Sequence, residues 1–74
     1  MARPAADLVE FVAKAIVDNP DEVGVRVDGD LIELETHADD RGRVIGRQGR
    51  VAKAMRALLG VSRDGANCRL DIVD

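Results

Sequence analysis

The sequence is poor in aromatic residues, with one phenylalanine, Phe11, and no tyrosine or tryptophan among its 74 residues. RNA-recognition-motif sheets and cold-shock folds stack bases on exposed aromatic rings, so a stacking platform of that kind is excluded. The chain is still 46% hydrophobic, which is enough for a compact core, and 34% charged, which is typical of a globular domain.

Cysteine and histidine are equally scarce, with Cys68 and His37 as single examples. One cysteine excludes an internal disulfide and is compatible with a reducing compartment. No metal-ligand cluster is present, so we predict no metal site and no cofactor. Glu33 and Glu35 have no nucleophile or base beside them, and no Walker ending follows the glycines, so we predict no catalytic residue and no enzyme.

The sequence has no long apolar run. A signal peptide and a membrane span are therefore not predicted, which fits a cytoplasmic protein without a membrane partner. Its length predicts one domain covering residues 1–74, and a body of this size has little room for a deep catalytic pocket. We therefore expect a binding domain rather than an enzyme.

Charge is distributed unevenly along the chain. Residues 1–40 carry three basic and eleven acidic side chains, whereas residues 41–63 carry seven basic side chains and no acidic one. The net charge of −3 therefore hides one strongly basic segment, and such a segment can attract a polyanion in spite of the total.

Hydrophobic spacing predicts the order helix, strand, strand, helix, helix, strand. The first helix is expected from Ala5 to Asp18, with a buried stripe formed by Leu8, Phe11, Val12, Ala15 and Ile16. Two strands follow around an Asp28-Gly29 turn, one with Val23, Val25 and Val27 and the other running from Leu31 to about His37 with Ile32 and Leu34 on one face.

A short helix is expected from Asp40 to Ile45, with Asp39 as its cap, and a longer one from Arg50 to Leu59, closed by Gly60. A loop with Asp64-Gly65 leads to the last strand, in which Cys68, Leu70 and Ile72 alternate with polar residues. The predicted fold class is an α/β (α+β) two-layer sandwich, a three-stranded sheet packed on one face by three helices.

The segment Gly46-Arg47-Gln48-Gly49 joins the two central helices. Gly46 can take the left-handed conformation that ends a helix, and Gly49 lies at the next helix start, where the first N–H groups have no helical partner. A phosphate can approach these donors because Gly49 has no side chain. Arg47 and Gln48 are expected to point outward.

The second of these helices has a basic face. Val51, Met55 and Leu58 lie within an arc of about 60°, and Arg50, Lys53 and Arg56 lie on roughly the opposite side. Arg50 and Lys53 are nearest the glycines and are the better candidates for phosphate contact.

The run Val44-Ile45-Gly46-Arg47-Gln48-Gly49-Arg50 resembles the I-G-x-x-G signature of KH domains, and the order of elements matches the type II, prokaryotic KH fold over essentially the whole chain. Among such proteins the chain is most similar to the bacterial single-KH-domain RNA-binding proteins of the KhpA family. The resemblance implies single-stranded RNA binding, with Gly46 to Gly49 clamping the backbone of about four nucleotides.

By the same resemblance, Val44 and Ile45 would form part of an apolar groove for bases, together with Ile32 or Leu34, although Ile45 could equally belong to the core. Arg43, Arg50 and Lys53 complete the predicted RNA-binding set. The family also implies a homodimer, or a heterodimer with a second KH-containing protein of the KhpB type. It further implies an RNA chaperone or post-transcriptional regulator with roles in cell elongation and envelope control.

Two alternatives remain open from the sequence. Residues 40–60 could form a helix-turn-helix that reads duplex DNA, although the leading helix is very short for that motif. The chain could also be mainly a protein-interaction or dimerisation module with weak RNA binding, because both the alanine-rich helix and the acidic first forty residues could contact proteins.

Overall fold

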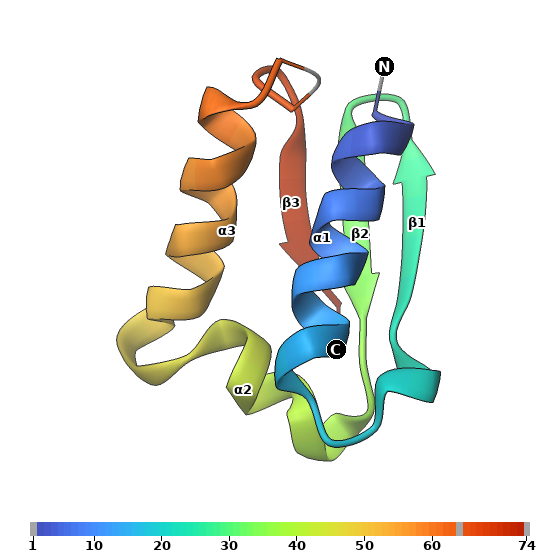
Figure 1. Cartoon of the computed structure of the whole chain (residues 1–74), viewed down its shortest axis with the longest axis vertical. Coiled ribbons are helices and arrows are strands. Elements are labelled where there is room, and N and C mark those ends of the chain that lie inside the picture. The colour runs from blue at the N-terminus through green and yellow to red at the C-terminus, as the bar shows by residue number, and fades with distance from the viewer. Residues whose placement is uncertain (1, 64, 74) are drawn as a thin grey trace.

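The computed structural model describes residues 2–63 and 65–73 (Figure 1). Its helices and strands are α1 (Arg3–Ile16), β1 (Gly24–Asp28), β2 (Leu31–Glu35), α2 (Arg41–Ile45), α3 (Arg50–Val61) and β3 (Arg69–Ile72). This order confirms the predicted one. Asp64, which the sequence places in a loop with Gly65, lies outside the described residues. No helix in the described part of the chain is long and apolar enough to cross a membrane.

The three strands form one mixed sheet in the order β1-β2-β3. β1 and β2 are antiparallel, with Asp28 opposite Leu31, and the tight turn between them has Gly29 at φ +59°. β2 and β3 are parallel, with Ile32 opposite Leu70. Parallel strands need a long crossover, and here α2 and α3 supply it. The helices cover one face of the sheet (Figure 1), as the predicted two-layer sandwich requires.

Alternation along the strands places the core on the helix side of the sheet. Ile32 and Leu34 of β2 are fully buried, and Leu70 of β3 is 6% exposed. The residues between them point to the open face, where Arg26 of β1 bonds Glu33 of β2 across the strands. A half-buried strand shows a period of two, so the alternation in the sequence was sufficient to predict which face of the strands is buried.

The predicted buried face of α1 is largely wrong: Val12 packs partly buried against the core, but Phe11, Ala15 and Ile16 are exposed. The helix packs on the sheet through its smaller residues, and Phe11 is 73% exposed. Small side chains let the helix axis come close to the sheet, whereas the predicted stripe of bulkier residues would hold it away. Both stripes have helical spacing, so periodicity alone could not select the right one. The buried residues of α1 are Ala5, Ala6, Val9 and Ala13.

The predicted inner face and end of α3 also need correction. Met55 is buried and Val51 packs partly buried against the core, as predicted, but Leu58 is 46% exposed, and Ala52 and Leu59 are buried in its place. Gly60 does not close the helix, which continues to Val61. Glycine is permitted inside a helix at a cost of about 1 kcal/mol relative to alanine, and tertiary packing overrides that preference here.

The start of α2 differs from the prediction as well. Asp39 is not the cap of this helix, because the His37 side chain accepts the Asp39 N–H at 3.0 Å and caps a 3-10 turn over Ala38–Asp40. The α-helix begins at Arg41 with Asp40 in the N-cap position, and the Asp40 side chain makes no capping bond to it. This carboxylate points instead to the turn after α1, where it accepts the N–H groups of Asp18 and Asn19.

Candidate nucleic-acid interface

The glycine loop lies at one end of the domain, between α2 and α3 (Figure 1), and has an unusual backbone. Positive φ occurs at Gly46 (+79°), Gln48 (+57°) and Gly49 (+74°). Gly46 combines it with ψ 167°, a region reached essentially by glycine alone, rather than the left-handed helical conformation that was predicted. Gly49 lies at the start of α3, as predicted, where it occupies the N-cap position in the left-handed conformation.

The backbone hydrogen bonds within this loop do not use the N–H groups of Arg47 and Gln48. The Gly49 N–H donates to the Gly46 carbonyl at 3.0 Å, and the Arg50 N–H donates to the Arg47 carbonyl. Arg47 and Gln48 begin the 3-10 turn Arg47–Gly49, where the first N–H groups have no acceptor within the turn, and neither N–H donates to a loop, strand or side-chain acceptor among the described residues. Two backbone donors in succession at the start of a helix form a favourable site for an oxyanion.

Three cations surround the loop. The side chains of Arg47, Arg50 and Lys53 are all exposed, and none of them forms an ion pair or side-chain hydrogen bond with another described residue. Their charges are therefore not neutralised by a neighbouring carboxylate, which gives this end of the domain a positive potential although the chain as a whole is acidic.

Two other arginines of the basic segment already have partners within the domain. Arg43 forms an ion pair with Asp18 at 2.9 Å and lies 3.9 Å from the Asp40 carboxylate. Arg56 donates from Nη2 to the Leu70 carbonyl of β3 at 3.2 Å. The structure thus separates the predicted basic set into side chains held by the fold and side chains free to meet a ligand.

The residues that precede the loop divide between core and surface. Val44 is fully buried, so its side chain anchors α2 in the core. It has no exposed surface with which to line the predicted groove for bases. Ile45 is 37% exposed and faces outward beside the glycines. Ile32 and Leu34, the other predicted groove residues, are core residues with no exposed surface.

A groove is present, but on a different strand. A cavity of about 310 Å³ lies between α3 and β3 and is lined by Arg56, Leu59, Cys68, Arg69 and Leu70. Residues three apart on a helix are rotated by about 60°, so Arg50, Lys53 and Arg56 form a row that winds from the glycine loop towards this cavity. Sequence reasoning missed the cavity because its two walls are separate segments that only the fold brings together.

These features define a class of protein. A three-stranded mixed sheet, helices on one face, and a glycine loop between two helices with exposed cations form a KH domain of type II. A family model described as "KhpA/KhpB, KH domain" matches residues 6–72 of the chain. The chain belongs to the KhpA family.

Curated relatives agree over the full length. The RNA-binding protein KhpA of Halalkalibacterium halodurans is 47% identical, with the alignment covering 90% of this chain and 96% of that protein. RNA-binding protein KhpA of Mycobacterium leprae is 46% identical, and the alignment covers 100% of this chain and 96% of that protein. RNA-binding protein KhpA of Leifsonia xyli is 44% identical, and the alignment covers 93% of this chain and 96% of that protein. No solved structure matches the chain.

The matched family is named for its KH domain and the relatives for RNA binding, and neither name describes an enzyme, which agrees with the prediction of no enzyme. Within the described residues, no group of three or more histidine, cysteine, aspartate or glutamate side chains could hold a metal ion.

Proposed function

We propose that this protein binds single-stranded RNA by holding one phosphodiester of the strand in the loop Gly46–Gly49. The observation that carries the proposal is the combination of free N–H groups at Arg47 and Gln48 with unpaired cations around them. The donors would hold phosphate oxygens, and the cations would supply attraction from a distance. The names of the curated relatives, all RNA-binding proteins, support the choice of ligand.

The bases of the bound strand are best accommodated by the cavity between α3 and β3. Leu59 and Leu70 give it apolar walls, and Arg56 and Arg69 give it a cationic rim. Unstacked bases are flat and apolar on their faces and polar at their edges, which fits such a lining. Ile45, on the surface beside the loop, would contact the strand between clamp and cavity.

A single strand fits this surface better than duplex DNA. A recognition helix for the major groove needs polar or basic residues along its exposed face. The basic side chains Arg50, Lys53 and Arg56 follow one side of α3, and the exposed surface beside them is apolar, with Ala54, Ala57 and Val61. A helix of five residues, α2, precedes it, which is too short for the supporting helix of that motif.

The test compares Gly49→Asp with Gly49→Asn. A β-carbon at Gly49 meets no atom within 4 Å, and both asparagine and aspartate tolerate positive φ, so the two variants have nearly the same shape and strain. Only the aspartate places a negative charge where the phosphate would lie. We expect Gly49→Asp to weaken binding of a short labelled RNA at least tenfold relative to Gly49→Asn. Equal affinities would contradict the clamp.

We further propose that α3 mediates association with a second KH-containing protein, either a copy of this chain or a partner of the KhpB type. Ala54, Ala57, Leu58 and Val61 are exposed at helical spacing, with Leu58 46% and Val61 86% exposed. An apolar stripe of this kind is what helices bury against one another. Small residues within it would permit close approach of a second helix.

Light scattering of Leu58→Lys and Val61→Lys tests this second proposal. If α3 forms the interface, both variants are monomers at concentrations where the parent chain associates, while Phe11→Lys on α1 associates normally. A parent chain that stays monomeric alone and does not bind a KhpB-type protein would contradict the proposal.

In the cell, we propose a role as an RNA chaperone or post-transcriptional regulator that acts with such a partner in control of elongation and the envelope. Crosslinking in cells, followed by recovery of RNA with the protein, tests the role directly. The Gly49→Asp chain should recover little RNA compared with Gly49→Asn.

A further inference from the structure

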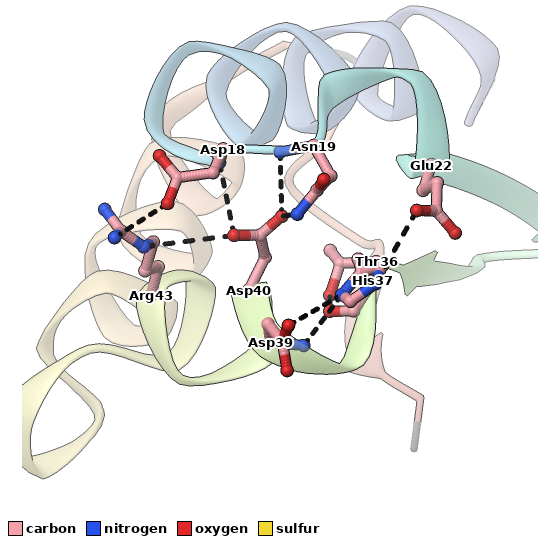
Figure 2. Close-up of polar contacts among 8 residues, drawn as sticks. All are labelled: Asp18, Asn19, Glu22, Thr36, His37, Asp39, Asp40 and Arg43. Carbon is pink, nitrogen blue, oxygen red and sulfur yellow. Dashed lines mark hydrogen bonds and ion pairs between the residues drawn. The ribbon is translucent and has the colours of Figure 1, made fainter.

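Asp40 is the one buried charged residue in the described part of the chain, at 1% exposed. Its carboxylate does not cap its own helix but crosses to the turn that follows α1 (Figure 2). Oδ1 accepts the Asp18 N–H at 3.1 Å, and Oδ2 accepts both the backbone N–H and the side-chain Nδ2 of Asn19 at 3.0 Å. Residues more than twenty positions apart are thus joined by three hydrogen bonds.

The charge of this carboxylate is maintained in spite of its burial. Burial acts to raise the pKa of Asp40, but the hydrogen bonds from Asn19 and from the Asp18 N–H, with the nearby Arg43 guanidinium, hold it below its ordinary value of 3.8. Arg43 also pairs with Asp18, so it closes the same cluster from the α2 side (Figure 2). With its pKa below 3.8, the Asp40 carboxyl is ionised at neutral pH and accepts these hydrogen bonds as a carboxylate.

The helix that carries Asp40 at its start depends on tertiary contacts for its position. α2 has five residues, whereas isolated helices shorter than about 12–15 residues are marginal in water. Val44 anchors one side of it in the core, and Asp40 anchors its beginning to the turn at Asp18 and Asn19. Gly46 follows six residues after Asp40, about 9 Å along a helix, so a shift of this anchor would move the glycine loop.

We propose that Asp40 is a positioning residue for the RNA clamp: its bonds to Asp18 and Asn19 fix α2 so that the loop Gly46–Gly49 has its binding geometry before RNA arrives. This inference rests on the proposed function of that loop. When only a fraction of molecules has the competent loop, the apparent affinity falls by that fraction. The anchor therefore acts on affinity without touching the ligand.

The experiment compares Asp40→Asn with Asp39→Asn. Both remove one negative charge from adjacent positions, but the Asp39 side chain is 86% exposed. Asparagine at position 40 keeps one acceptor oxygen and directs an NH₂ group at backbone N–H donors. Removing a negative charge should by itself strengthen RNA binding slightly. We expect the reverse for Asp40→Asn, about tenfold weaker binding of a labelled single-stranded RNA with an unchanged salt slope, and a change within twofold for Asp39→Asn.

Amide NMR spectra of the unbound proteins give a second readout, which separates positioning from a general loss of stability. At a temperature where both variants are folded, Asp40→Asn should shift the Gly46 and Gly49 resonances and leave Leu70 in place. A folded Asp40→Asn chain with parental affinity and parental loop resonances overturns the inference.

Asn19→Ala covers the case in which Asp40→Asn does not fold, because it removes one of the three hydrogen bonds only. We expect binding about two- to threefold weaker with shifted loop resonances, and parental values for both overturn the inference. Failure of the proposed function is a different result: RNA affinity would then be equal for Gly49→Asp and Gly49→Asn, while the NMR comparison at Asp40 still reports on the position of the loop.

Discussion

Gly46 packs directly against Val51 across the glycine loop: a β-carbon on Gly46 would stand 2.6 Å from Val51 Cγ2 and 2.7 Å from the Val51 nitrogen. Real β-carbons essentially never come this close, so the end of α2 and the first turn of α3 can meet only if this residue is glycine. Gly49, three residues later, has open space around it and needs glycine only for its positive φ. Glycine is therefore required at position 46 by close packing as well as by backbone conformation, and at position 49 by backbone conformation alone.

This difference predicts unequal stabilities. Gly46→Ala combines a disallowed backbone region with a steric clash and should lower the free energy of unfolding by about 3 kcal/mol. Gly49→Ala meets only the left-handed strain and should lower it by about 1 kcal/mol. Urea denaturation of both variants measures the difference. Equal losses would mean that Val51 can move aside freely.

Substitution of Phe11 is expected to change the stability of the fold only slightly, whereas substitution of a buried phenylalanine usually lowers it strongly. Because its side chain is 73% exposed on α1, Phe11→Gln should change the free energy of unfolding by less than about 1 kcal/mol. Val9, at 1% exposed on the opposite side of the helix, is the control, and Val9→Ala should cost about 2 kcal/mol. A larger loss of stability for Phe11→Gln than for Val9→Ala would mean that Phe11 is buried, as the sequence predicted.

The pairing of the basic residues predicts which of them set the salt dependence of RNA binding. Each phosphate neutralised contributes about 0.7 to the slope of log affinity against log salt for a single strand, and the expected total is about −2 to −3. Arg50→Gln should reduce the slope by about 0.7, because Arg50 has no partner among the described residues. Arg43→Gln should leave it unchanged, because Arg43 is paired with Asp18. A loss of slope in Arg43→Gln would place Arg43 on the RNA.

The lowered pKa of Asp40 predicts a specific acid dependence of stability. A carboxyl group whose pKa is lower in the folded chain stabilises the fold above its ordinary value of 3.8, and that contribution is lost as pH falls through the folded pKa. Wild type should therefore be more stable than Asp40→Asn at neutral pH, and the gap should narrow below about pH 4. Urea titrations from pH 7 to pH 3 measure it. A gap that widens in acid would mean that burial raises the pKa instead.

The sheet and the glycine loop were predictable because their determinants are local. Alternation of Ile32 and Leu34 with glutamates specifies which strand face is buried, and a positive φ at a helix junction is readily met by Gly46 and Gly49. The face of α1 was not predictable, because two apolar stripes share one helical period and only the sheet surface selects between them. The role of Asp40 was hidden for a related reason: its hydrogen-bond partners precede it by more than twenty residues.

An amide NMR titration of the protein with a short single-stranded RNA tests the clamp at Gly46–Gly49 most directly. The largest shifts are expected from Gly46 to Lys53 and along β3 beside the cavity, with Arg26 and Glu33 on the open sheet face unchanged. Shifts concentrated on the open face or on α1, with the glycine loop unaffected, would contradict it.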